Sequence, residues 1–311
     1  MTQSDKSVSI LMGTYNGESY LPDQLNSFHE QSYDNWTLTA SDDGSKDNTI
    51  EILKKYQHDW GEDKLKIIDG PREGFCRNFM HLTIEDNGES DYYAWSDQDD
   101  IWLPHKLSRI IELISPIGEE EALLYCGRTQ LMNQYGVDTT LSPLRTSPPP
   151  SFSNAIIQSI AGANTMVFNN KARDLIVKGY PLKPISHDWW AYQIVTGAGG
   201  LVIYDPVPTI RYRQHSQNII GSNNGLLAFA GRVKKAWQRN FRQMNDRNFQ
   251  ALYALEDYLT SINKETLDTL VSLRKRTSLW NLHRQIKKYN IYRRSFVQQL
   301  ALYIGFLAQR I

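Results

Sequence analysis

A regular alternation of strand-like and helical segments over the first hundred residues constrains this chain more than any other feature. Buried or alternating apolar runs predict strands, and apolar residues spaced three and four apart predict helices. The predicted strands are 7–12, 36–41, 64–69 and 91–96, and the predicted helices are 19–31, 48–57 and 74–86. This order is typical of an α/β fold with a mostly parallel sheet and helices on both faces.

Three polar clusters directly follow predicted strands. They are Tyr15-Asn16, Asp42-Asp43 and Asp97-Gln98-Asp99-Asp100. Ligands of such sheets bind at the carboxyl ends of the strands, so we expect the three clusters to converge on one site. Each cluster also has a purely structural interpretation. Residues 42–45 fit a plain turn, and Tyr15 fits either a core aromatic or a platform for a stacked nucleobase.

The acidic run contains three carboxylates within four positions, Asp97, Asp99 and Asp100. Carboxylates this close repel one another unless a cation or hydrogen bonds offset their charge. Mg²⁺ and Mn²⁺ take oxygen ligands and often bridge to phosphates, so the run is a candidate clamp for a metal-bound diphosphate. The alternative is a helix N-terminus, because Asp99 and Asp100 also fit as caps of a helix that starts near 103–104.

Two later segments carry candidate catalytic groups. In His187-Asp188-Trp189-Trp190 a carboxylate stands beside two indoles, which suggests a general base next to a platform for a sugar ring. A helix start capped near Asp188 explains the same run. His215 follows another strand-like segment and fits either a third metal ligand or a loop histidine with satisfied hydrogen bonds. A proline-rich loop over 142–150 is expected to arch over or beside the site.

The charge is distributed unevenly although it sums to zero over 311 residues. Residues 1–225 carry a net −11, whereas residues 226–311 carry +11 and show helical spacing with almost no proline. A basic helical tail fits an anionic membrane surface. It fits equally a helical bundle that packs on the acidic domain or builds an oligomer. The polar N-terminus lacks a secretory signal pattern, which predicts a cytoplasmic protein.

Composition narrows the class further. A 41% hydrophobic and 22% charged chain is neither wholly disordered nor a many-span membrane protein. Two cysteines exclude a disulfide framework and a four-cysteine zinc site. The leading hypothesis is an enzyme, and a nucleotidyltransferase with paired aspartates is one kind of enzyme that fits. Two non-enzyme hypotheses also remain: a non-catalytic binder of nucleotide sugars or carbohydrates, and a nucleic-acid binder that uses the basic tail. The acidic first 225 residues weigh against nucleic acid as a partner.

Taken together, these motifs resemble the large family of inverting nucleotide-sugar glycosyltransferases with the GT-A fold. The runs Ser96-Asp97-Gln98-Asp99-Asp100-Ile101-Trp102 and Tyr212-Arg213-Gln214-His215 look most like its bacterial rhamnosyltransferase branch. The resemblance covers roughly 7–220. It implies a GT-A catalytic domain over 1–225, with a donor half at about 1–105 and an acceptor half at about 106–225. Residues 226–311 would then form a basic helical domain for membrane association, oligomerisation or both.

The resemblance also implies roles for individual residues. Asp188 matches the catalytic base, and Asp99 and His215 match the metal site, with Asp97 a further candidate ligand. The implied contacts to the nucleotide sugar are Thr14, Tyr15, Asn16, Asp43, Arg77, Asn78 and Asp97. The implied contacts to the acceptor are Trp189, Trp190 and Asn164. In this scheme Tyr15 stacks on the pyrimidine, Asp43 accepts a hydrogen bond from its N3–H, and the metal is Mn²⁺ or Mg²⁺.

The activity implied by the resemblance is transfer of a sugar, L-rhamnose from dTDP-L-rhamnose, to a growing cell-surface polysaccharide that is perhaps linked to lipid. Another nucleotide-diphosphate hexose is the alternative donor. Two departures from the family pattern stand out. His187 precedes Asp188 where the family often has Glu, and the Gln-x-x-Arg-Trp motif of processive synthases is missing. Without that motif we do not expect a synthase with its own membrane channel. The expected location is the cytoplasm, either free or peripheral on the inner face of the plasma membrane.

Overall fold

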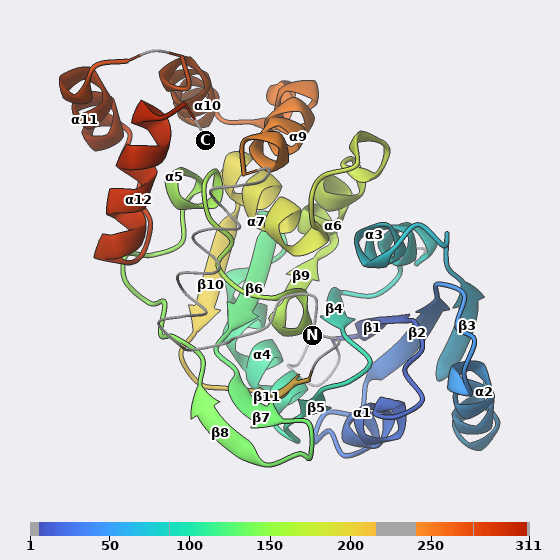
Figure 1. The fold of residues 1–311 in the computed structure, drawn as a ribbon. Helices are drawn as coiled ribbons and strands as arrows, with labels where there is room; N and C mark the ends of the chain where they lie inside the picture. The colour runs from blue at the N-terminus through green and yellow to red at the C-terminus, as the bar shows by residue number, and fades with distance from the viewer. Residues whose placement is uncertain (1–5, 87, 216–240, 276, 310–311) are drawn as a thin grey trace.

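The computed structural model describes residues 6–86, 88–215, 241–275 and 277–309. Two sheets form its centre, and helices surround them (Figure 1). The strands of the larger sheet are β1 (Val8–Thr14), β2 (Trp36–Asp42), β3 (Leu65–Asp69), β4 (Tyr92–Ser96), β6 (Leu123–Gly127), β9 (Val167–Asn169) and β10 (Leu201–Asp205). The strands of the smaller sheet are β5 (Ile101–Trp102), β7 (Gln130–Asn133), β8 (Asp138–Leu141) and β11 (Ile210–Gln214).

The larger sheet has the strand order β10-β6-β9-β4-β1-β2-β3. All neighbours are parallel except β9, which runs antiparallel to both β4 and β6. Strand β1 lies between β4 and β2, and its residues are almost wholly buried, as its continuous apolar run predicts. The predicted strands and their mostly parallel arrangement are confirmed. The carboxyl ends of β1, β2 and β4 lie at one edge of the sheet.

Helices cover both faces of the larger sheet, as expected. The helices before β10 are α1 (Leu21–His29), α2 (Thr49–Trp60), α3 (Phe75–Glu85), α4 (Lys106–Ile114), α5 (Phe152–Ala155), α6 (Asn170–Val177) and α7 (His187–Gly197). Helices α1 and α4 contribute Leu25, Phe28 and Ile110 to one core. Helices α3 and α7 contribute Phe79 and Trp190 to a second core on the other face. The sheet therefore separates two hydrophobic cores.

The smaller sheet places residues from distant segments beside the acidic run. Its order is β5-β11-β7-β8, with β11 antiparallel to β5 and parallel to β7. Strand β5 directly follows Asp100, so residues 97–100 are a strand-to-strand connection. The alternative of a helix capped by Asp99 and Asp100 is not seen, because α4 begins only at Lys106 and no side chain caps it. Pairing of β5 with β11 brings His215 back toward the acidic run.

The described C-terminal helices are α9 (Phe241–Ala254), α10 (Ser261–Leu273), α11 (Leu279–Lys288) and α12 (Phe296–Leu307). They pack beside α5 and α7 (Figure 1), and Phe249, Leu267 and Leu302 belong to the same core as Trp190. The predicted domain boundary at 225 lies outside the described residues. Within the described ranges, no helix is both long and apolar enough to cross a bilayer.

Candidate active site

A cavity of about 1080 Å³ opens at the carboxyl ends of β1, β2 and β4. Most of the site residues predicted from the sequence line it. They are Thr14, Tyr15, Asn16, Asp43, Asn78, Asp97, Asp99, Asn164, Asp188 and His215. The volume is at the upper end of that of small-molecule sites. The predicted convergence of the three polar clusters on one edge of the sheet is therefore observed.

Asp42 and Asp43 are neighbours with different tasks. The Asp42 carboxylate is buried and accepts hydrogen bonds from Thr14 Oγ1 at 3.0 Å, Ser45 Oγ at 2.5 Å and the Ser45 amide at 2.8 Å. It ties the loop after β2 to the end of β1. The Asp43 carboxylate lines the cavity and accepts from the amides of Arg72 at 2.6 Å and Gly74 at 2.8 Å. Each Asp43 oxygen keeps a second lone pair for a ligand.

Tyr15 stands at the mouth of the cavity with 54% of its surface exposed. Its backbone is held from both sides, because Gln98 Oε1 accepts from the Tyr15 amide and Gln98 Nε2 donates to the Tyr15 carbonyl, each at 2.9 Å. A Cβ on Gly17 would lie 2.2 Å from Gln98 Oε1, so this close approach requires glycine. The backbone that carries the ring is thus held in place while the ring itself stays exposed, which suits stacking on a planar nucleobase.

The acidic run forms a compact group of oxygens. Asp97, Asp99 and Asp100 each offer a carboxylate oxygen, and these oxygens lie within 4.8 Å of one another. Burial and the negative charges of Asp99 and Asp188 raise the pKa of Asp97 to about 7. His215 Nε2 lies 2.8 Å from Asp99 Oδ2. His215 is therefore beside the acidic run, where a third metal ligand would lie. The negative charges of Asp99 and Asp188 both act on Asp97, so a cation beside Asp97 would offset this repulsion.

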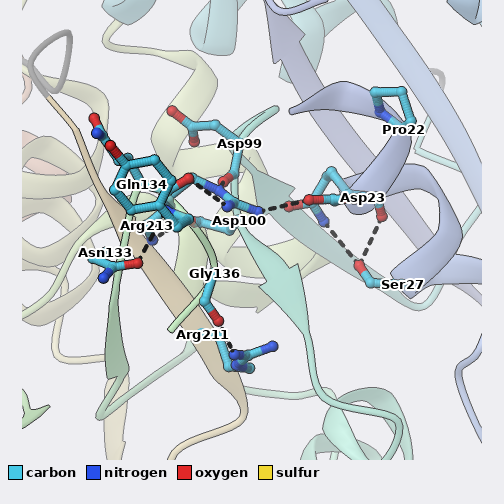
Figure 2. Close-up of polar contacts among 12 residues, drawn as sticks. Pro22, Asp23, Ser27, Asp99, Asp100, Asn133, Gln134, Gly136, Arg211 and Arg213 are labelled. Atoms are coloured by element: carbon cyan, nitrogen blue, oxygen red, sulfur yellow. Dashed lines mark hydrogen bonds and ion pairs between the residues drawn. The ribbon is translucent and has the colours of Figure 1, made fainter. Parts of the chain in front are cut away.

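Asp100 holds the run in place and does not face the cavity. It is fully buried and accepts from Asn164 Nδ2 at 2.6 Å and from the Arg213 amide at 3.0 Å. The Arg213 guanidinium donates to the Asp99 carbonyl at 2.9 Å and to Asp23 Oδ2 at 2.9 Å. Figure 2 shows Arg213 between Asp23 and the Asp99–Asp100 segment. Arg213 therefore fixes the backbone that carries Asp99.

A second buried cation lies behind the acidic run. Lys106 has no exposed surface, donates from Nζ to the Asn164 carbonyl at 2.8 Å and lies 4.0 Å above the Trp102 ring. Burial lowers the pKa of Lys106 to about 7, although the charges of Asp100 and Asp97 oppose that shift. The side-chain amide of Asn164 donates a hydrogen bond to Asp100. Binding of an acceptor by the same nitrogen, as the resemblance implies, would compete with this hydrogen bond.

The residues at this site fit a divalent cation. Asp97 and Asp99 supply hard oxygen donors on the cavity wall, His215 supplies an imidazole nitrogen, and Asp100 is engaged elsewhere. The raised pKa of Asp97 shows that the group is electrostatically unfavourable with the protein's own residues alone. Oxygen-rich sites of this kind suit Mg²⁺ or Mn²⁺.

Asp188 is the second residue of α7 and lines the same cavity. Its Oδ1 accepts from the Trp189 amide at 2.7 Å, and the helix N-terminus favours a negative charge at this position. His187 precedes it and is buried against Phe79, with ring centroids 4.3 Å apart and planes stacked at 10°. Burial lowers the pKa of His187 to about 4, so the imidazole is neutral near pH 7.

Three of the implied residues do not line the cavity, and a fourth, Asn78, lines it with its side-chain amide already bonded. Trp189 and Trp190 are buried, donate to the carbonyls of Ala155 and Ile176, and do not line the cavity. Arg77 points away to stack on Tyr180, 3.6 Å from its ring centroid. The Asn78 amide lines the cavity floor, but both of its polar atoms bond Ser41. Helical periodicity explains this outcome, because these residues occupy the core-facing sides of α7 and α3.

Two arginines that line the cavity, Arg72 and Arg145, were not singled out in the sequence, and neither was a positioning role for Gln98. Arg72 lines the cavity through the loop that Asp43 holds, and Gln98 positions Tyr15. Arg145 lies in the proline-rich loop, which does border the cavity through Ser142, Pro143 and Arg145, as expected. The only sequence signal for Arg72 and Arg145 is positive charge in a loop near candidate phosphate ligands, and that signal is weak.

A family model and a named relative match this chain in sequence. Residues 9–152 match the model described as glycosyl transferase family 2. The dTDP-rhamnosyl transferase RfbG of Shigella flexneri is 28% identical over 243 residues, which cover 73% of this chain and 81% of that protein.

Two solved structures resemble the whole described chain. Mannosyltransferase PcManGT from Pyrobaculum calidifontis in complex with GDP-Man and Mn²⁺ has a TM-score of 0.51 at 15% identity, covering 99% of this chain and 88% of that chain. S. aureus TarS 1-349 in complex with UDP-GlcNAc has a TM-score of 0.50 at 15% identity, covering 91% and 89%. At such identities these likenesses concern the fold, and they confirm the expected GT-A architecture with its helical C-terminal region.

Proposed function

We propose that this chain, a glycosyltransferase with a family 2 domain over residues 9–152, transfers L-rhamnose from dTDP-L-rhamnose to a hydroxyl of a growing saccharide. The observation that carries the proposal is that Asp188 lines the same cavity as Asp97 and Asp99, close enough for its charge to raise the pKa of Asp97. Asp97 and Asp99 would supply oxygen ligands for a cation on a diphosphate, and Asp188 would supply a carboxylate that takes a proton. A purely binding protein would have no use for Asp188 in this place.

In the proposed reaction, Asp188 takes the proton of the acceptor hydroxyl. The freed oxygen forms a bond to the anomeric carbon of the donor sugar. The bond between that carbon and the diphosphate oxygen breaks on the opposite side, and dTDP leaves with the electron pair. One displacement of this kind inverts the anomeric centre. General base catalysis typically contributes about 10²–10⁴-fold to the rate.

The nucleotide side of the cavity would orient the donor. Tyr15 offers an exposed ring to the pyrimidine, and Asp43 offers its remaining lone pairs to the N3–H of the base. Asp97, Asp99 and His215 would hold the cation, which when bound offsets the negative charge that develops on the leaving diphosphate. Arg72 and Arg145 also line the cavity and add positive charge there.

The donor and acceptor assignments have separate support. The dTDP-rhamnosyl transferase of Shigella flexneri supports dTDP-L-rhamnose, and the mannosyltransferase solved with Mn²⁺ supports a divalent cation. For the acceptor, the resemblance favours a cell-surface polysaccharide. A cavity of about 1080 Å³ leaves room for a saccharide beside the nucleotide sugar.

A donor screen tests the proposal. Isothermal titration of the full chain with dTDP-L-rhamnose, UDP-glucose, UDP-galactose and GDP-mannose, each with Mn²⁺ and with EDTA, should show cation-dependent binding of the rhamnose donor alone. Binding of another donor would contradict the rhamnose assignment and leave a glycosyltransferase. Absence of binding by all four would contradict the proposed site.

A further inference from the structure

Helix α12 presents an apolar stripe to solvent. Phe296 is 84% exposed, and Leu300, Ile304 and Leu307 continue the same side at intervals of four, four and three residues. Leu302 and Phe306 on the other side are buried in the protein core. No described residue covers the stripe, and the twelve residues of α12 include none that is charged. Exposed apolar patches of this kind usually mark an interaction site.

Helix α11 extends this stripe. It packs against α12 and is linked to it by His283 Nδ1 and Tyr303 Oη at 3.0 Å. At its start, Trp280 is 70% exposed and Leu279 is also exposed. Both helices form an outer corner of the molecule in Figure 1. We call the exposed apolar residues of both helices the α11–α12 face: Leu279, Trp280, Phe296, Val297, Leu300, Ile304 and Leu307.

The charged residues of α11, α12 and their flanking segments are all basic, and Glu265 of α10 pairs with Lys288 at the end of α11 at 3.2 Å. Residues 269–311 contain nine Lys and Arg residues and no Asp or Glu. Among the described ones, Lys275, Arg284 and Lys287 are exposed. Arg284 lies 4.8 Å from the Trp280 ring centroid, at the border of the apolar patch. Apolar and aromatic side chains flanked by basic ones are typical of helices that lie in a membrane interface.

We propose that the α11–α12 face docks this chain on an anionic membrane surface. Aromatic and aliphatic side chains would enter the headgroup region, and the surrounding cations would meet the lipid phosphates. A second copy is a poorer occupant, because a two-fold contact brings the same patch of both copies together and would place like charges side by side. Helix α12 is also too short to span the bilayer, so the contact is peripheral.

Docking at this face would orient the cavity. Directly before α12, Arg294 Nη1 donates to the carbonyls of Arg145 at 2.6 Å and Pro148 at 2.8 Å, and Tyr292 Oη donates to Pro149 at 2.7 Å. The loop that lines the cavity is therefore hydrogen-bonded to the residues directly before α12. This consequence, unlike the membrane contact itself, rests on the proposed function: it would bring a lipid-linked acceptor to the site.

Vesicle co-sedimentation of the full chain tests the docking. Vesicles of phosphatidylcholine with phosphatidylglycerol should bind it, and pure phosphatidylcholine vesicles should bind it more weakly. The variant Phe296→Ser with Val297→Ser and Leu300→Ser should lower the partition coefficient by at least about ten-fold, since three buried apolar contacts are lost. Arg284→Gln with Lys287→Gln should lower it on the anionic vesicles by about thirty-fold, near 1 kcal/mol per charge.

Two matched controls lie on the catalytic domain. Tyr135→Ser with Val137→Ser removes exposed apolar side chains, and Lys54→Gln with Lys55→Gln removes exposed charges. Both should leave vesicle binding unchanged. Failure of the unaltered chain to bind anionic vesicles, or equal losses in the controls, would overturn the proposal. A dimer in light scattering that only the α12 variant dissociates, without loss of vesicle binding, would assign the face to self-association instead. Donor titration, which does not involve this face, separates these outcomes from a failure of the proposed function.

Discussion

The two sides of the cavity are built in different ways. On the proposed donor side, Tyr15, Asp43 and Asp97 each follow a strand directly, so neighbouring parallel strands bring them together. On the proposed acceptor side, the loop at 142–150 is held by Tyr292 and Arg294, which lie more than 140 positions away between α11 and α12. Neighbouring strands of the sheet therefore position the residues of the proposed donor side, whereas contacts between distant segments position the loop of the proposed acceptor side. Changes on the two sides should consequently affect different measured quantities.

The largest expected effect is on the base. Asp188→Asn should reduce turnover about 10³-fold, because the amide cannot take the acceptor proton. The measurement is dTDP release from dTDP-L-rhamnose over a panel of synthetic saccharide acceptors. Asp174→Asn, an exposed and isosteric change in α6, is the control and should retain activity. Turnover by Asp188→Asn at the level of this control would remove Asp188 as the base.

Two arginines on strand β11 provide a test of stability. Arg213→Gln should lower the free energy of unfolding by about 3 kcal/mol, because it leaves a buried hydrogen-bond network without its centre. Arg211→Gln breaks a more exposed ion pair with Asp138 and should cost less than about 1 kcal/mol. Chemical denaturation of both variants checks this difference. Equal losses would show that Arg213 is not the fixing residue of the acidic run.

The buried imidazole predicts a pH effect. The pKa of His187 in the folded chain is about 4, below its ordinary value of 6.5, so the unfolded chain binds the proton more readily. His187 therefore destabilises the fold as the pH falls from 6.5 toward 4. Between pH 7 and pH 4.5, His187→Phe should gain about 2 kcal/mol of unfolding free energy relative to the unaltered chain.

Comparison with the variant isolates this effect. The raised pKa of Asp97 acts in the opposite direction, but both proteins share it, so it cancels in the difference. His58→Phe, at an exposed histidine in α2, is the control. A difference between His187→Phe and the unaltered chain that stays constant over this pH range would contradict the buried neutral imidazole.

The smallest effect is expected on the acceptor side. Arg294→Gln removes two hydrogen bonds to the loop that lines the cavity, so the KM for a soluble acceptor should rise about five-fold while the donor Kd stays the same. Arg284→Gln, an exposed change in α11, should alter neither. A rise in the donor Kd with an unchanged acceptor KM would show that the C-terminal helices support the donor side.

The same contrast explains what the sequence could predict. Strand and helix periodicity predicted the donor half of the sheet, and the position of Asp43 and Asp97 at strand ends predicted their place at the cavity. Periodicity did not distinguish an aromatic platform from an aromatic core, so Trp189 and Trp190 were expected at the acceptor and lie in the interior. It also did not predict β6, β7 or β8; the four residues of β8 are all exposed and β7 has only four residues, so neither carries a clear apolar pattern.

Contacts between distant segments were the least accessible to sequence reasoning. The pairing of β5 with β11 places His215 beside Asp99, whereas the sequence alone left His215 as either a third metal ligand or a loop histidine. No motif indicated that Arg294 and Tyr292 would hold the loop at 142–150. Such contacts depend on how whole helices pack, which a local pattern does not encode.

The central claim is that two carboxylates of one cavity have separate tasks, with Asp99 serving the metal-bound donor and Asp188 serving the acceptor proton. Side-by-side calorimetric titration of Asp99→Asn and Asp188→Asn with dTDP-L-rhamnose and Mn²⁺ tests it most directly. The account predicts that Asp188→Asn binds the donor as the unaltered chain does, while Asp99→Asn loses the part of the affinity that depends on Mn²⁺. Retention of that part by Asp99→Asn, with its loss in Asp188→Asn, would contradict the account.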